Sequence, residues 1–294
     1  MAAALQLECV ADGQFTALPR EGRQRRIYGG QLMAQALAAA GASVPDELAV
    51  HLMHVRFLAP ADPAVAVDYA VEPNSDRGRF AYRRVLATQG DTPILEVSAS
   101  FHRAETGPGH QLPGHAPGEP EGLPTFEELA QNGADESTRR WWERLQQWIP
   151  VEIRAPVVPG RWRPRPGEEF VPRQHVWLRT YDDLGDDALA HDCAAAYCSD
   201  LFLLTAAMVR HGLRHDDDGV FAVTLNHTMW FHAPFRADEW FRYEQEGSWS
   251  GGARQLCRGQ LFDRAGRLVA TTMQEGLLRV DEHGARTGEQ RLAC

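Results

Sequence analysis

Alternating hydrophobic and polar positions along the chain predict a sheet made from two sets of strands. In Val65–Val71 the apolar residues recur at every second position, as expected for a strand with one buried face. Glycine-containing segments at Gln89–Asp91 and Arg264–Gly266 separate consecutive runs and favour antiparallel hairpins. The predicted strands are Val65–Val71, Phe80–Ala87, Ile94–Phe101, Trp240–Glu246, Ala253–Phe262 and Leu268–Val280.

Three segments carry a helical composition instead. Gln31–Ala40 precedes the first set of strands, and Asp187–Leu213 precedes the second. A further helix is predicted over Thr125–Trp148, where Thr125 and Glu128 have the spacing of a capping box. One long helix followed by antiparallel strands, occurring twice, predicts an α+β fold in which each sheet wraps its helix.

The two halves also resemble each other in sequence. Ala49–Pro60 is similar to Ala222–Pro234, and Pro60 lies 174 residues before Pro234. The same offset relates Ile94–Ser98 to Leu268–Thr272. This agreement predicts a duplicated unit of about 100 residues. We expect an N-terminal unit at 1–103, a Pro/Gly-rich linker with one helix at 104–172, and a C-terminal unit at 173–294.

Composition narrows the possible partners. The chain has 294 residues, of which 44% are hydrophobic, so it can bury a core without a disulfide or a metal. The net charge of −10 argues against nucleic-acid binding, which depends on clustered Lys and Arg. Local arginines can still hold the phosphates of an anionic ligand. The candidates are Arg23, Arg25, Arg26, Arg77, Arg79, Arg83 and Arg84.

Targeting features favour a cytoplasmic protein. The five cysteines are scattered and odd in number, as expected for reduced thiols. The first residues lack a basic region followed by an apolar run, and no apolar run approaches the ~18 residues of a membrane helix. The C-terminal Arg291–Cys294 is not a peroxisomal address. We therefore expect no membrane association.

Several familiar catalytic motifs are missing from the sequence. The nearest match to a Gly-x-Ser-x-Gly elbow, Gly247–Gly251, has Trp249 at the nucleophile position. There is no phosphate-binding loop and no His-Glu-x-x-His helix. His211 and His215, beside the acidic run Asp216–Asp218, are typical of a solvated helix end. We expect neither a metal nor another cofactor.

Three polar residues within apolar runs remain as candidates. Asp200 precedes Leu201–Leu204, and a partly buried carboxylate there would have a raised pKa suited to general-base chemistry. Asp200 can equally serve as a helix cap. Thr224 fits a strand because it is β-branched, and Gln274 requires either a buried partner or an exposed face.

A family resemblance gives these residues roles. Motifs across about 13–280 are similar to those of the bacterial acyl-CoA thioesterase II family. They are Tyr28–Ala36, His51–Pro60, Tyr197–Leu201, Val223–His232 and Thr272–Gly276. The resemblance implies a double hotdog fold and a site of Asp200, Thr224 and Gln274 that hydrolyses fatty-acyl-CoA to fatty acid and CoA. Chemically, Asp200 can take a proton from water that the other two side chains hold.

Other residues are predicted to bind the substrate. Gly29 and Gly30 permit close approach to a helix start, where backbone N–H groups can meet an oxyanion. His51 and Trp230 are candidates for the pocket wall. The 174-residue offset takes Gln274 to Ser100 and Asp200 to Arg26, so we expect one chemical site per chain, with the first unit supplying walls.

Two alternatives stay open from the sequence. An enoyl-CoA hydratase usually pairs Asp with a nearby His, but Thr205 occupies the position five residues after Asp200. A non-catalytic acyl-CoA-binding protein is the second alternative. Because hotdog sheets tend to pair across subunits, we expect a homodimer or homotetramer.

Overall fold

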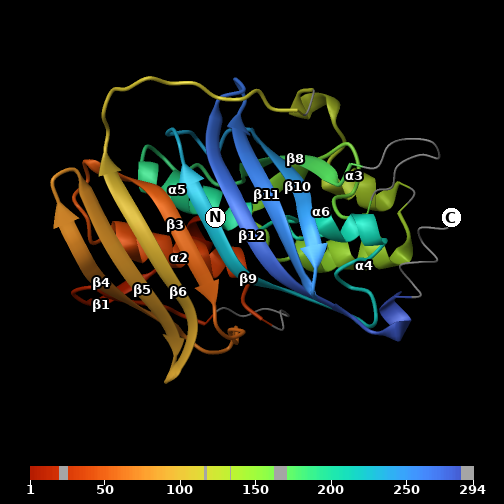
Figure 1. The fold of residues 1–294 in the computed structure, drawn as a ribbon, viewed down its shortest axis with the longest axis horizontal. Helices are drawn as coiled ribbons and strands as arrows, with labels where there is room; N and C mark the ends of the chain where they lie inside the picture. Colours follow the sequence, from red (N-terminus) through yellow and green to blue (C-terminus); the bar gives the residue numbers. More distant parts are fainter. Residues whose placement is uncertain (20–25, 116–117, 133, 162–170, 286–294) are drawn as a thin grey trace.

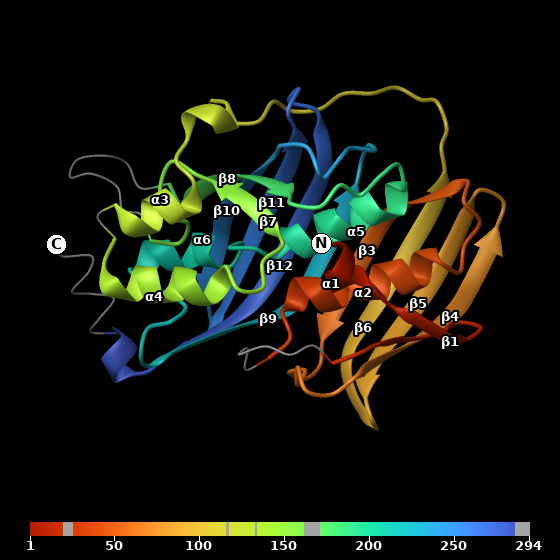
Figure 2. The ribbon, with the colours of Figure 1, turned by 180° about the vertical axis from the view of Figure 1, so that it is seen from behind.

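The computed structural model describes residues 1–19, 26–115, 118–132, 134–161 and 171–285. These residues form one twelve-stranded antiparallel sheet with helices on one face (Figures 1 and 2). The strands are β1 (Glu8–Ala11), β2 (Gln14–Ala17), β3 (Leu48–Phe57), β4 (Val67–Arg77), β5 (Phe80–Gln89), β6 (Thr92–Arg103), β7 (Val151–Arg154), β8 (Arg173–Thr180), β9 (Val220–Phe231), β10 (Phe241–Gly251), β11 (Arg254–Asp263) and β12 (Leu268–Val280).

The helices are short, and two of them lie at the centre of the molecule (Figure 2). They are α1 (Ala2–Leu5), α2 (Gly29–Gly41), η1 (Pro120–Gly122), α3 (Phe126–Gln131), α4 (Glu136–Leu145), α5 (Ala188–Ser199), α6 (Thr205–Met208) and η2 (Val209–His211). Within the described ranges, no helix is long and apolar enough to cross a membrane.

The order of strands in the sheet shows the duplication. From edge to edge it is β1-β2-β4-β5-β6-β3-β9-β12-β11-β10-β8-β7. The predicted offset of 174 residues relates the bounds of β4 to those of β10 and the bounds of β5 to those of β11. β3 and β9 pair at the centre, from Leu52 opposite Trp230 to Arg56 opposite Asn226. The result is the double hotdog architecture that the resemblance implies.

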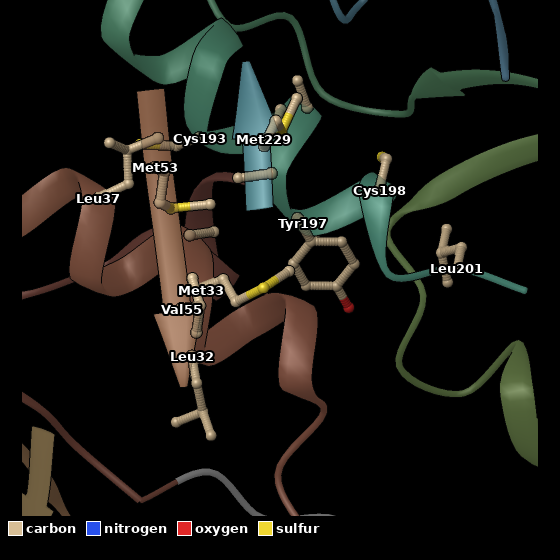
Figure 3. Packing of buried hydrophobic residues seen from close by; sticks show 14 of the residues in the cluster. Leu32, Met33, Leu37, Met53, Val55, Cys193, Tyr197, Cys198, Leu201 and Met229 are labelled. Carbon is tan, nitrogen blue, oxygen red and sulfur yellow. The ribbon is translucent and has the colours of Figure 1, made fainter. Parts of the chain in front are cut away.

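The central helices α2 and α5 run antiparallel to each other beneath the sheet. Leu189, in the first turn of α5, lies where a side chain on Gly41 at the end of α2 would be. At the opposite ends, Asp200 after α5 accepts a hydrogen bond from Gly30 N in α2. Fully buried side chains such as Met53 and Met229 fill the space between helices and sheet (Figure 3). Burying each such side chain stabilises the fold by about 1.5–3 kcal/mol.

Two predicted helices are shorter than expected. The helix predicted over Asp187–Leu213 ends at Ser199, and Phe202 takes a left-handed conformation with φ of 62°. A bulky residue in that region interrupts helical hydrogen bonding, and α6 begins only at Thr205.

The linker helix predicted over Thr125–Trp148 is likewise two helices. The capping box of Thr125 and Glu128 is present at the start of α3. Asn132 then leaves helical geometry, with φ of −93° and ψ of 88°, and the Asp135 side chain caps a new helix, α4. The edge strands β1 and β7 and their neighbours β2 and β8 were not predicted.

Candidate active site

Asp200, Thr224 and Gln274 come together from three elements. Asp200 follows the last residue of α5, whereas Thr224 and Gln274 lie on the neighbouring strands β9 and β12. Gln274 Nε2 lies 2.7 Å from Asp200 Oδ1 and 2.7 Å from Thr224 Oγ1. Thr224 Oγ1 lies 3.4 Å from Asp200 Oδ1. The three predicted side chains therefore form one hydrogen-bonded cluster.

A β-bulge turns Thr224 into this cluster. Gln274 pairs with His227 and Glu275 pairs with Asn226, but Gly276 pairs with Thr224, so Leu225 has no partner on β12. Thr224 is three residues from His227, so regular alternation along β9 would place Thr224 and Gln274 on opposite faces of the sheet. The bulge brings both side chains to the face that the helices cover, a common use of bulges next to functional sites.

The start of α2 holds the second oxygen of the Asp200 carboxylate. Gly30 N donates a hydrogen bond of 3.0 Å to Asp200 Oδ2, where the positive end of the helix dipole favours an anion. A side chain on Gly29 would come within 2.8 Å of the same oxygen. Glycine at position 29 is thus required by the closeness of Asp200. Since Gly30 N–H binds Asp200, it is already occupied, contrary to the expectation that it is free for an oxyanion.

Burial governs the acidity of Asp200. Desolvation raises its pKa above the ordinary value of 3.8, while hydrogen bonds from Gln274, Gly30 and Thr224 partly oppose the rise. Asp200 and Thr224 remain partly exposed, but Gln274 is only 1% exposed. Gln274 therefore forms the back of the site, and the other two side chains form the side that water can reach.

A cavity of about 1380 Å³ lies beside the start of α2. Tyr28 and Gln31 line it on one side, and Trp141, Leu145 and Trp148 of the linker region line it on the other. Asp200, Thr224 and Gln274 are not among the residues that line it. Tyr28 connects the two regions, because its hydroxyl donates to Tyr197 O at 3.0 Å and its ring packs against Trp148.

The other predicted binding residues are divided between two faces of the sheet. Gly29 and Gly30 lie against Asp200. His51 instead bonds to Ser100 Oγ at 2.7 Å and packs against Phe80, which is exposed. Trp230 is 38% exposed and points away from the buried Met229 next to it. His51 and Trp230 thus lie on the outer face, away from the cluster.

The predicted arginine cluster is largely engaged in ion pairs. Arg83 pairs with Asp76, Arg84 with Glu72 and Glu96, and Arg79 with Glu105. Arg26 lines the cavity. Arg23 and Arg25 lie outside the described residues.

The offset that relates the strands does not apply to the central helices. The residue that caps the C-terminus of α2 is Ala42 and the residue that caps α5 is Asp200, so Asp200 corresponds to Ala42 and not to Arg26. Ala42 has no acidic group. The prediction that the first unit lacks the three side chains is therefore unchanged, although Arg26 was the wrong equivalent of Asp200.

Sequence reasoning missed a second layer of residues behind the cluster. His227 Nδ1 lies 3.1 Å from Gln274 Oε1, and His227 Nε2 lies 3.0 Å from Ser199 Oγ. Tyr243 Oη donates to Ser199 O at 2.6 Å. The signal was available, because His227 and Gln274 occupy opposing apolar-face positions once β9 and β12 are aligned.

Comparison with known proteins places the chain among thioesterases. Residues 146–277 match the family described as acyl-CoA thioesterase, and residues 18–102 match the acyl-CoA thioesterase N-terminal domain. The chain is 38% identical to human acyl-coenzyme A thioesterase 8 over 87% of its own length and 81% of that protein. It is 32% identical to acyl-CoA thioesterase 2 of Haemophilus influenzae, over 95% and 96% of the two chains.

Solved structures agree with these matches. The crystal structure of an acyl-CoA thioesterase II from Mycobacterium marinum aligns with a TM-score of 0.77 at 34% identity, covering 95% of this chain and 98% of the other. A hot dog fold protein from Alicyclobacillus acidocaldarius aligns with a TM-score of 0.67 over 96% and 99%, and at 17% identity it supports the fold alone.

Proposed function

The chain belongs to the acyl-CoA thioesterase family and hydrolyses acyl-CoA thioesters, and we propose that Asp200, Thr224 and Gln274 activate the attacking water. The observation that carries this proposal is the shared hydrogen bonding of Gln274 Nε2 to Asp200 Oδ1 and Thr224 Oγ1. An amide that binds both side chains fixes a carboxylate base and a hydroxyl within reach of one water molecule.

The proposed reaction needs no covalent acyl-enzyme. Asp200 takes one proton from the water while the water oxygen attacks the carbonyl carbon of the thioester. The tetrahedral intermediate then breaks its C–S bond, and the departing thiolate receives the proton from Asp200. The products are a free fatty acid and CoA. Asp200 is suited to this role because burial raises its pKa toward the working pH.

We place the acyl chain and the CoA in the cavity beside α2. Its walls carry Leu145, Trp148 and Val67 for an acyl chain, and Arg26 and Arg144 for anionic groups. Its volume of about 1380 Å³ exceeds the roughly 300–1,000 Å³ of ordinary ligand pockets. This space supports a long, flexible substrate. Gly29 also belongs to the proposed substrate contacts, because it lies against Asp200 and directly follows Tyr28, which lines the cavity.

The experiment is release of free CoA from a panel of short to long acyl-CoAs by the wild type and by Asp200→Asn. We expect the variant to lose about 10²–10⁴-fold in kcat, the usual contribution of a general base. Wild-type hydrolysis that persists in Asp200→Asn would overturn the proposed site. An absence of hydrolysis with every substrate would favour a non-catalytic acyl-CoA-binding protein, or a hydratase if enoyl-CoA is hydrated.

Thr205 weighs against the hydratase alternative. It occupies the position where that chemistry would place a histidine, and its hydroxyl donates to Phe202 O at 2.5 Å. This bond belongs to the turn that leads into α6, away from the cluster. We therefore retain hydrolysis as the proposed reaction.

We further propose a cytoplasmic homodimer or homotetramer. The outer face of the sheet exposes Phe80, Tyr82 and Trp230, and exposed aromatic side chains favour association between copies. The buried cysteines Cys193, Cys198 and Cys257 are unpaired, which supports a reducing compartment. Light scattering of the purified protein would test the assembly, and a single peak at the mass of one chain would contradict it.

A further inference from the structure

His227 is a fully buried histidine behind the proposed site. It is 0% exposed, and each of its ring nitrogens faces a polar partner. Nδ1 lies 3.1 Å from Gln274 Oε1, and Nε2 lies 3.0 Å from Ser199 Oγ. Ser199 immediately precedes Asp200, so His227 connects the segment that carries the base with the strand that carries Gln274.

The bonding partners of Gln274 determine which way its amide points. A carboxylate only accepts hydrogen bonds, so the amide nitrogen must face Asp200 and the amide oxygen must face His227. An amide oxygen only accepts, and Nδ1 of His227 must therefore carry the proton. The distances thus fix both the amide orientation and the tautomer.

The other ring nitrogen is an acceptor. Burial lowers the pKa of His227 to about 4, so the ring is neutral and Nε2 carries no proton. Ser199 Oγ donates to Ala196 O at 2.8 Å and lies 3.0 Å from Nε2, so its single proton has two acceptors within reach. The donation that orients the amide runs from His227 to Gln274 and from Gln274 to Asp200.

We propose that His227 is a positioning residue that holds the Gln274 amide with its nitrogen toward Asp200 and Thr224. Without the Nδ1–H donor, the amide oxygen would be buried without a partner, and the amide could rotate by 180° and turn that oxygen toward the Asp200 carboxylate. His227 does not line the cavity beside α2. Its loss should therefore lower kcat and leave KM nearly unchanged. This inference rests on the proposed roles of Asp200 and Gln274.

Two substitutions separate hydrogen bonding from packing. In His227→Asn the side-chain amide nitrogen reaches the place of Nδ1 and retains a donor to Gln274. His227→Gln is nearer to histidine in length, but its amide lies near the place of Nε2 and leaves Gln274 without that donor. We expect kcat to fall roughly 10- to 100-fold in His227→Gln, the range for an unpaired buried polar group, and clearly less in His227→Asn.

The pH profile gives a readout that a packing defect would not change. The hydrogen bond from Gln274 lowers the pKa of Asp200, so losing the amide orientation raises it further. The acid limb of kcat/KM should move to higher pH in His227→Gln and stay near the wild-type position in His227→Asn. Equal losses in the two variants with no movement of that limb would overturn the proposal.

A measurement on the wild type keeps the test independent of folding in the variants. The ¹⁵N chemical shifts of His227 should show a protonated Nδ1 and an unprotonated Nε2, and the opposite tautomer would overturn the inference. Failure of the proposed catalytic site is a separate result, because Asp200→Asn would then stay active. An inactive Asp200→Asn together with full activity in His227→Gln would overturn the role of His227 alone.

Discussion

His54 Nδ1 lies 2.7 Å from Thr228 Oγ1, and the two residues are 174 positions apart in the chain. That separation equals the offset that relates the strands of the two units. Each residue is therefore the counterpart of the other, and they meet where β3 pairs with β9. The pseudo-twofold axis between the units passes through this pair, and the site at Asp200 lies on one side of it.

The pH dependence of hydrolysis should report the environment of Asp200. Since burial raises the pKa of this carboxyl, its protonated form persists to higher pH than in an ordinary aspartate. We expect kcat/KM to decline with falling pH, with an apparent pKa above the ordinary value near 3.9. A stopped-flow profile from pH 4 to pH 9 tests this, and a flat profile down to pH 4 would contradict it.

Gly29→Ala should damage the chemistry more than the fold. The new methyl group would lie 2.8 Å from Asp200 Oδ2 and 3.2 Å from the ring of Phe57, so the carboxylate must move. We expect a fall in kcat of about tenfold or more, because small displacements of catalytic groups have large effects. Gly41→Ala at the other end of α2 is a matched control, since its methyl group would meet the side chain of Leu189.

Thr224→Val should lower hydrolysis while leaving the sheet intact. Valine keeps the branched shape of threonine but has no hydroxyl to accept the hydrogen bond from Gln274 Nε2 or to bind water. We expect kcat to fall roughly 10- to 100-fold; circular dichroism would verify the fold, and a free-CoA assay would measure activity. Substituting Leu225→Ala keeps the hydroxyl of Thr224 and the bulge and serves as the control, for which we expect activity to be largely retained. Nearly wild-type activity in Thr224→Val would argue against a role for Thr224.

Asp192 should make the folded protein less stable as pH rises. Burial, with a smaller contribution from Asp187, raises the pKa of Asp192 to about 7. Between about pH 4 and pH 7 the folded state therefore binds more protons than the unfolded state, and the free energy of unfolding decreases with increasing pH.

The decrease in the free energy of unfolding caused by Asp192 is large enough to measure. A rise in pKa from 3.8 to about 7 corresponds to at most about 4 kcal/mol. Asp192→Asn removes the titrating group, so urea unfolding at pH 5 and pH 8 should show a smaller stability difference in the variant than in the wild type. An identical difference in both proteins would contradict the prediction.

Much of the fold could be predicted because strand patterns are local. The period-two alternation and the glycine turns located the starts of β4, β5, β10 and β11 to within two residues, whereas β4 and β10 extend to Arg77 and Gly251, beyond the predicted ends at Val71 and Glu246. β8 was missed, although it pairs with β10 on one side and with the edge strand β7 on the other, because its sequence shows no regular alternation of apolar and polar residues. The break after Ser199 depends on a left-handed Phe202, and composition alone favoured a continuous helix there.

The site residues show the same contrast between features that are local in sequence and features that depend on distant contacts. A family motif named Asp200, Thr224 and Gln274, but the bulge at Leu225 that orients Thr224 arises from pairing between strands and has no local signature. The contact between Asp200 and Gly30, two residues 170 positions apart, likewise depends on the antiparallel packing of α5 against α2. The substrate-binding roles predicted for His51 and Trp230 were argued from proximity in sequence, and strand alternation places both side chains on the outer face.

The antiparallel pair of helices α2 and α5 has two equivalent ends, and the residues at these ends have different roles. At one end Asp200 meets Gly30 and is poised for chemistry; at the other, Leu189 packs against Gly41. The counterparts of Asp200, Thr224 and Gln274 are Ala42, Val50 and Ala99, because Met53, the counterpart of His227, pairs with Ala99 where His227 pairs with Gln274. Because the two units lie in a single chain, their sequences can differ, so that one contact between α2 and α5 carries the proposed site and the equivalent contact at the other end only packs the units together. A second reactive centre would therefore have to be engineered at the contact between Gly41 and Leu189.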